Sequence, residues 1–97
     1  MPTYVTLFNW TDQGVKNVKD TANRVEQARE AFAGSGVTIS AIYWTQGRYD
    51  LIGIIEAPDD PTLAAALLRL ATSGNVRTET LRAFDTQEMQ AILKNIG

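Results

Sequence analysis

The sequence predicts an α+β fold, in which two helices cover one face of a four-stranded antiparallel sheet and a further helix follows at the C-terminus. Four short segments have the composition and alternation of strands, and two longer segments between them have helical periodicity. Only three residues separate the second and third strand segments, a length that requires an antiparallel hairpin. No linker or repeat interrupts the 97 residues, which predicts a single domain over residues 1–97.

The first half of the chain predicts strand, helix and strand. Val25, Ala28 and Phe32 have the spacing of a buried helix face, and the glycines of Gly34–Gly36 end that helix. The following residues are rich in β-branched and aromatic side chains, as strands are. The expected elements, in order, are a strand over 3–10, a turn over 11–14, a short helical piece over 15–19, a helix from about 21, and a strand over 37–45.

The second half repeats this pattern. Asp60 followed by Pro61 predicts a helix start with Asp60 as N-cap. Asp85 and Glu88 form a capping-box pattern that predicts the start of the final helix. The buried stripe of the middle helix is expected at Leu63, Leu67, Leu70 and Ala71. The expected elements are a strand over 49–57, a helix from 60 that ends near 73–75, a strand over 76–84, and the final helix.

This order, β-α-β-β-α-β, is typical of ferredoxin-like sandwiches, whose helices lie on the same face of the sheet. We expect the helices to cover the aliphatic side chains: Val5, Leu7, Leu81 and Ala83. The other face would then carry Tyr4, Thr6, Phe8, Trp10, Thr78, Thr80 and Arg82. Three aromatic side chains facing water on one strand would form an unusual exposed patch. We therefore predict that two copies pair through this face, with interface residues Tyr4, Thr6, Phe8 and Thr80.

Composition excludes several kinds of active site. The chain has no cysteine, which excludes disulfides, thiolate metal sites and cysteine nucleophiles. It also has no histidine, so it lacks the commonest metal ligand, the usual axial haem ligand and the commonest general base near neutral pH. No nucleotide-binding loop, zinc pattern or nucleophile–base pair is present. We therefore predict no metal and no cofactor.

Charge and hydropathy exclude two classes of partner. The net charge is −2 and the nine Lys and Arg residues are scattered, whereas sequence-independent binding of nucleic acid needs a clustered basic face. No apolar stretch approaches the roughly 20 residues of a membrane helix, and the first residues do not resemble a signal peptide. We predict a cytoplasmic protein that binds neither nucleic acid nor membranes.

Three blocks of the sequence resemble the GYD-domain family of small bacterial and archaeal proteins. The blocks are residues 2–14, with Asn-Trp-Thr-Asp-Gln-Gly at 9–14, Gly47–Asp50, and Gly74–Phe84. In the second block Arg48 is inserted into the Gly-Tyr-Asp motif that names the family, and the helix start at 56–60 also fits. The resemblance spans nearly the whole chain and implies a ferredoxin-like dimeric α/β barrel. It implies no settled biochemical role, because this fold occurs in ligand-sensing modules as well as in small isomerases and oxygenases.

Seven residues are candidates for ligand binding, because their side chains offer hydrogen bonds, charge or a flat apolar wall at strand ends and at the hairpin. They are Asn9, Trp10, Tyr43, Arg48, Tyr49, Asp50 and Arg82. A structural interpretation of each stays open. Gly47 and Asp50 are equally suited to turn geometry, and Trp10 to interface packing. The neighbours Tyr43 and Trp44 point to opposite faces of the sheet, and the sequence does not say which.

Arg82 is the candidate that most needs a partner, because a buried guanidinium must be satisfied by an anion. Glu56 or Asp50 would serve as a partner within the protein, and the carboxylate of a ligand is the alternative.

Three functions fit these observations. The first is a binding or sensing module, a homodimer or higher homo-oligomer whose inter-sheet cavity takes a small anionic or aromatic metabolite. The second is a cofactor-independent isomerase or oxygenase, in which Asn9, Trp10, Tyr49 and Arg82 would orient the substrate. The third is a structural subunit of a larger assembly. The sequence does not decide between them.

Overall fold

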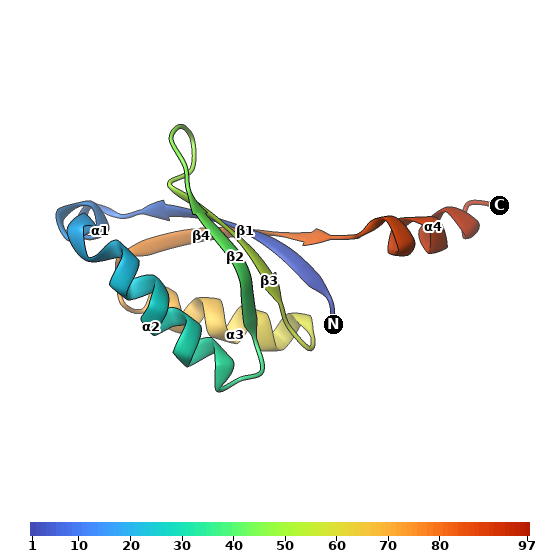
Figure 1. Ribbon diagram of the computed structural model, residues 1–97, viewed down its shortest axis with the longest axis horizontal. Coiled ribbons are helices and arrows are strands. Elements are labelled where there is room, and N and C mark those ends of the chain that lie inside the picture. The colour runs from blue at the N-terminus through green and yellow to red at the C-terminus, as the bar shows by residue number, and fades with distance from the viewer.

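The computed structural model, which describes residues 1–97, has the predicted α+β architecture, with α2 and α3 on one face of a four-stranded sheet (Figure 1). The strands lie in the order β2-β3-β1-β4 and every neighbouring pair is antiparallel. This order is compatible with a ferredoxin-like fold. The strands are β1 (Thr3–Trp10), β2 (Thr38–Trp44), β3 (Leu51–Glu56) and β4 (Val76–Ala83). The helices are α1 (Asp12–Lys16), a 3-10 turn (Val18–Asp20), α2 (Thr21–Ala33), α3 (Asp60–Ala71) and α4 (Thr86–Lys94).

Local signals set the helix starts. The capping box predicted for α4 is confirmed: an Asp85 carboxylate oxygen accepts the Glu88 N–H at 2.8 Å, and a Glu88 carboxylate oxygen accepts the Asp85 N–H at 3.1 Å. The start predicted for α3 is wrong by one residue, because Asp59 is the N-cap and accepts the Thr62 N–H at 2.8 Å. The carboxylate of Asp60 instead accepts the hydroxyl of Tyr4 on β1.

The prediction of which sheet face is covered by helices is wrong. The side chains of Tyr4, Thr6 and Phe8 are 3%, 0% and 5% exposed, and Tyr4 and Phe8 belong to the core between the sheet and the helices. These three residues therefore do not form an interface with a second sheet, because their side chains are already buried within one chain. Thr80 also fails as an interface residue of the free face, since it is paired with Thr6 and lies on the same side of the sheet.

The residues expected beneath the helices lie on the opposite face. By strand register and alternation, this helix-free face carries the four side chains Val5, Leu7, Leu81 and Ala83. Thr78 and Arg82 lie across from Phe8 and Tyr4, so they belong to the helix side.

Packing explains why the aromatic side chains lie under the helices. Phe8 stands beside Gly53 of β3, and a Cβ on that glycine would lie 3.3 Å from the ring. The missing side chain therefore makes room for the ring in the layer between sheet and helices. Tyr4 gains a hydroxyl partner at the start of α3 that the helix-free face does not offer. Aromatic side chains bury large apolar areas, and here α2 and α3 cover those of Tyr4 and Phe8.

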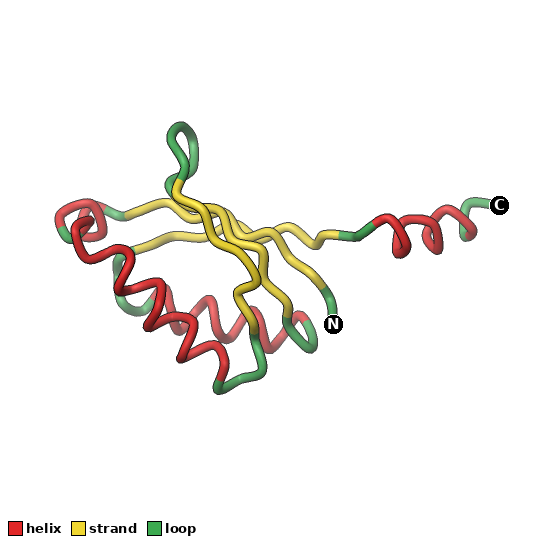
Figure 2. Tube along the Cα trace, viewed as in Figure 1, coloured by secondary structure: helices red, strands yellow, loops and turns green.

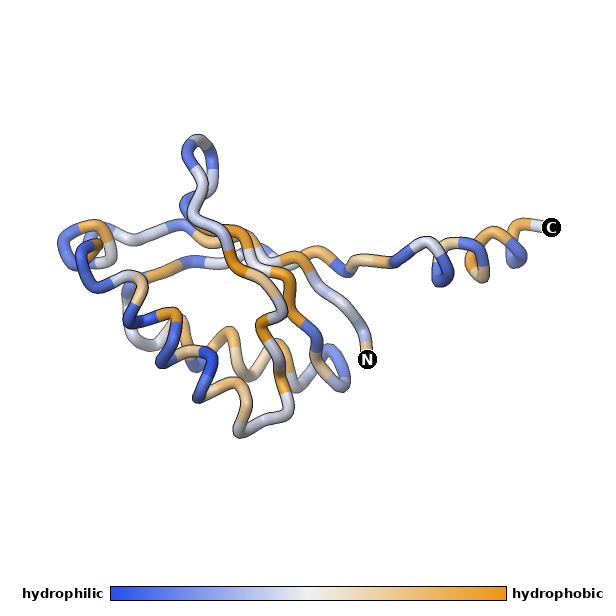
Figure 3. The backbone as a smooth tube through the Cα atoms, viewed as in Figure 1, coloured by the Kyte–Doolittle hydropathy of each residue, from blue (hydrophilic) through white to orange (hydrophobic).

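Two segments project from this two-layer body. The hairpin loop at 45–50 rises from the sheet on the side away from the helices (Figure 2). α4 extends beyond the end of β4, which gives the molecule dimensions of 52 × 31 × 18 Å. Polar residues interrupt the apolar residues of α4, whereas apolar residues follow one another in β3 (Figure 3). None of the helices is both long enough and apolar enough to cross a membrane.

Candidate functional site

The helix-free face of the sheet has an aliphatic centre. Val5 and Leu7 of β1 lie between Ile54 and Ile52 of β3 on one side and β4 on the other. All four side chains are half-buried even though no helix covers them. The full apolar set, which we call the open face, is Val5, Leu7, Ala41, Tyr43, Ile52, Ile54, Leu81 and Ala83. Leu81 is 48% exposed and Tyr43 is 62% exposed, so contiguous apolar surface faces solvent here.

α4 carries a second unpartnered apolar surface. Its apolar residues are spaced i, i+3, i+4 and i+7, the pattern of one helix face. We call this set the α4 stripe: Met89, Ile92 and Leu93 within α4, and Ile96 two residues past its end. Three of them are among the exposed large apolar residues, and no residue of α4 is buried. Glu88, in the first turn of α4, forms an ion pair with Arg82 at 3.5 Å. The α4 stripe itself lies beyond the body of the domain (Figure 1).

The hairpin residues Gly47 and Asp50 have the structural roles that their types favour. Gly47 has a φ of +125°, which a residue with a side chain rarely adopts. The Asp50 carboxylate accepts the Trp10 N–H at 2.9 Å, and the Asp50 N–H donates to the Phe8 carbonyl at 2.8 Å. Asp50 therefore joins the hairpin to the end of β1.

The other hairpin candidates lie on the side of the open face. The Tyr49 hydroxyl is hydrogen-bonded to a Glu79 carboxylate oxygen at 3.1 Å, and the Arg48 guanidinium lies 5.6 Å from the Tyr49 ring. Asn9 is paired with Arg77 of β4. Tyr43 belongs to the open face. Its neighbour Trp44 points to the helix side, where its indole N–H is hydrogen-bonded to the Thr21 hydroxyl at 3.1 Å.

Arg82 lies apart from the other candidates. It is opposite Tyr4, whereas Trp10 is opposite Val76, and six residues of strand separate the two ends by about 20 Å. Its carboxylate partner is Glu88, not the predicted Glu56 or Asp50.

The guanidinium of Arg82 also lies 4.6 Å from the Phe84 ring centroid and 5.6 Å from that of Tyr4. Asn9 and Trp10, as strand neighbours, face opposite sides of the sheet. The four residues suggested for an enzymatic site therefore do not meet within one chain.

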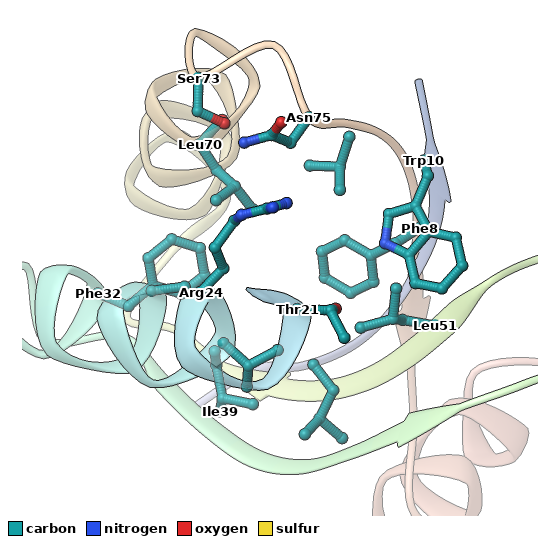
Figure 4. A pocket seen from close by; sticks show the side chains of 14 residues that line it. Phe8, Trp10, Thr21, Arg24, Phe32, Ile39, Leu51, Leu70, Ser73 and Asn75 are labelled. Carbon is teal, nitrogen blue, oxygen red and sulfur yellow. The ribbon is translucent and has the colours of Figure 1, made fainter. Parts of the chain in front are cut away.

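A cavity lies between the sheet and the helices, and Trp10 is the only one of the seven ligand-binding candidates that lines it (Figure 4). Arg24 and Asn75 at its edge were not among the candidates predicted from the sequence. Arg24 is on the side of α2 that the sequence pattern assigns to solvent. Asn75 stands where the preceding helix was expected to end, within the Gly74–Phe84 block that resembles the GYD domain, and was not a site candidate. The sequence carries no signal for this pairing. The close approach of Asn75 is visible only in the structure, where a Cβ on Gly14 would lie 2.1 Å from the Asn75 carbonyl oxygen.

Two ionisable groups where β1 meets the start of α3 have shifted pKa values. The hydrogen bond to the Asp60 carboxylate raises the pKa of Tyr4 above its usual value, and burial acts in the same direction. Hydrogen bonds from Thr62 lower the pKa of Asp59, because they stabilise the charged form of the carboxylate. Both shifts belong to the junction between β1 and α3, so they indicate a structural role.

Known proteins agree with this architecture. A curated relative from Thermus thermophilus, named "Glutamine synthetase and cystathionine beta-lyase binding protein", is 35% identical over 95 residues, which are 97% of this chain and all of the relative. The crystal structure of TTHA0845, also from Thermus thermophilus, has a TM-score of 0.56 and 28% identity, and covers 89% of this chain and 96% of its own. The sequence model of the GYD domain matches residues 4–93. The chain therefore belongs to the GYD-domain family.

Proposed function

We propose that this chain is a homodimeric binding protein that docks on a metabolic enzyme. The observation that carries the proposal is the pair of unpartnered apolar surfaces, the open face and the α4 stripe, on one small chain. The name of the Thermus thermophilus relative, which records binding to two enzymes, supports an enzyme as the partner of the assembled dimer.

The areas of the two surfaces favour a second copy as the occupant. Four strands and about six residues of each make a face roughly 20 Å on a side, or about 400 Å². Stable dimers bury about 800 Å² on each partner. The open face alone falls short of that value, and an α4 stripe laid on the partner copy adds apolar area toward it. Reciprocal contacts of this kind close into a two-fold dimer.

A small-molecule role remains part of this proposal. Two open faces packed together would enclose mostly aliphatic side chains. At one end they would also enclose Asn9, Arg77 and Glu79, the polar groups that such a space offers to a metabolite. Native mass spectrometry of the dimer would detect a retained compound, and a dimer that carries none would argue against this part.

Dimerisation is tested by one substitution on the open face and a matched one elsewhere. Leu81→Glu places a charge on the open face and should shift the chain to monomer in sedimentation velocity. Leu68 on α3 is 69% exposed and outside both surfaces, so Leu68→Glu should leave the dimer intact. Leu93→Glu in the α4 stripe should weaken the dimer to an intermediate degree. A parent chain that is monomeric at about 100 µM would contradict the proposal.

Enzyme docking is measured by biolayer interferometry, with purified glutamine synthetase and cystathionine beta-lyase from the source organism of this chain. We expect at least one enzyme to bind the parent dimer with a Kd in the micromolar range or below. The Leu81→Glu monomer should bind more weakly than Leu68→Glu. Absence of binding to both enzymes at about 100 µM would contradict an enzyme-binding role of the relative's kind.

A further inference from the structure

The cavity between the sheet and the helices has an apolar interior. Its volume is about 60 Å³, and ten of its fourteen lining residues are hydrophobic. Phe8 and Leu51 line it from the sheet, and Val25 and Ala28 from α2. The four remaining lining residues are Thr21, Arg24, Ser73 and Asn75. The polar groups are therefore a minority of the lining.

The polar end of the cavity is its mouth. A surface groove between α2 and α3 shares several lining residues with the cavity, among them Arg24, Ala28, Leu70 and Asn75. A second depression, beside the 3-10 turn, also includes Arg24 and Asn75. Figure 4 shows the Arg24 side chain reaching from α2 across the cavity toward Asn75. These two residues stand where the apolar interior meets both outer depressions.

The mouth is positively charged although the chain as a whole is negative. The charged side chains that line the cavity and the two depressions are Lys16, Lys19, Arg24 and Arg69 on the basic side, and Asp20 alone on the acidic side. The net charge of the chain is −2. An excess of three positive charges at one corner of an acidic protein favours an anion there.

Arg24 retains donors for such an anion. Its Nη2 donates to the Asn17 carbonyl. Its Nε lies 3.8 Å from an Asp20 carboxylate oxygen, which is beyond hydrogen-bond distance. The guanidinium carries five N–H groups, and its Nη1 has no partner in the protein. The side chain is 23% exposed, so an anion at the mouth would meet a guanidinium that is already positioned.

We propose that this cavity binds a small amphipathic carboxylate, with its apolar tail between the sheet and the helices and its carboxylate on Arg24 and Asn75. A guanidinium and an amide N–H₂ are the groups that bind a carboxylate well. The cavity lies within one chain, so the inference does not depend on the dimer proposed above.

The cavity volume sets the length of the tail. A water-sized group needs about 10–15 Å³ of such space, so 60 Å³ holds roughly four to six methylene-sized groups. Hexanoate, with five carbons beyond its carboxylate, should therefore fill the interior. Butanoate should bind more weakly because it leaves part of the interior empty. Decanoate should bind no more tightly than hexanoate, because the interior cannot hold its whole tail while its carboxylate stays at the mouth.

Isothermal titration calorimetry on the full chain tests this with hexanoate, butanoate, decanoate and hexan-1-ol. We expect hexanoate to bind at least tenfold more tightly than hexan-1-ol. Arg24→Gln should remove that difference, whereas Arg48→Gln at the hairpin, which lines none of these depressions, should leave it unchanged. Ala28→Leu fills the mouth and should weaken both ligands. Thermal unfolding of each variant checks that it is folded.

The inference is overturned if hexanoate and hexan-1-ol bind equally to the parent chain, or if neither binds at millimolar concentration. It is also overturned if Ala28→Leu folds normally and binds hexanoate as the parent does. As a second readout, the amide resonances of residues 73–76 should shift in ¹⁵N NMR spectra with hexanoate, and those of residues 46–49 should not.

Discussion

The two faces of one sheet differ in whether helices cover them and in the shape of their side chains. On β1, Tyr4, Thr6 and Phe8 are buried under α2 and α3, while Val5 and Leu7 lie on the open face without cover. Both faces are apolar, yet only the helix side is closed within the chain. Apolarity therefore does not tell which face a helix covers. The difference lies in shape, because the covered face combines large rings with a glycine that accommodates them.

Phe8 and Leu7 offer the largest contrast. Phe8→Ala removes a buried ring and should lower the free energy of unfolding by about 3–5 kcal/mol. Leu7→Ala, one residue away on the open face, should cost about 1 kcal/mol in the monomer because the side chain is half-exposed. Urea denaturation measures both. Equal losses for the two variants at low protein concentration would remove the distinction between the faces.

Gly53 tests whether ring packing distinguishes the covered face. A Cβ at this position would lie 3.3 Å from the Phe8 ring, so Gly53→Ala should lower the unfolding free energy by about 1–3 kcal/mol. Gly34→Ala is the control, because the only close atom there is a helix carbonyl oxygen at 3.4 Å and the backbone is helical. If the two substitutions had the same effect on the urea midpoint, the glycine would not be making room for the ring.

Substitution of Thr6 tests how much a buried hydroxyl on the covered face contributes to the free energy of unfolding. Its hydroxyl is fully buried and lies 3.3 Å from the Thr80 hydroxyl. Thr6→Val deletes this contact, while the exposed Thr80 can turn to water, so the expected loss is about 1 kcal/mol or less. Thermal unfolding detects the change. A loss as large as that of Phe8→Ala would mean that this hydroxyl pair, not the rings, organises the covered face.

The smallest effect is a pH dependence at the start of α3, the helix that covers this face. The Asp59 carboxylate has a lowered pKa in the folded chain. Its contribution is therefore present above the unfolded pKa of about 3.8 and is lost as the pH falls through the lower folded value. Asp59→Asn keeps a capping side chain but does not titrate. Urea midpoints from about pH 5 to about pH 2 should fall less steeply for Asp59→Asn than for the parent. Parallel slopes would contradict this.

The elements of the fold were predictable because their signals are local. Strand alternation, helical spacing and the Asp85–Glu88 capping box act over a few residues, and the structure contains each of these elements. The covered face was not predictable in the same way. β3 reads Leu-Ile-Gly-Ile-Ile-Glu, so both of its faces are apolar. Alternation then separates the two faces without saying which one lies under the helices.

The candidate site was predictable only in part. The turn chemistry of Gly47 and Asp50 follows from their residue types, and the structure confirms it. Arg24 and Asn75 come together only because α2 and the loop before β4 meet in space. Helical spacing places Arg24 on the polar side of α2, and no local pattern marks a side chain at the edge between core and solvent.

Because α4 projects from the body of the domain, its helical content should depend on the protein concentration. Nine residues are fewer than an isolated helix needs to persist in water, so α4 gains its stability from whatever it packs against. In the proposed assembly, dilution would unwind residues 86–94 while the sheet and its two helices stay folded. Proteases cleave unwound termini first. The abundance of this protein would then govern how long residues 86–94 stay intact, since paired copies keep them helical and solitary copies expose them to cleavage.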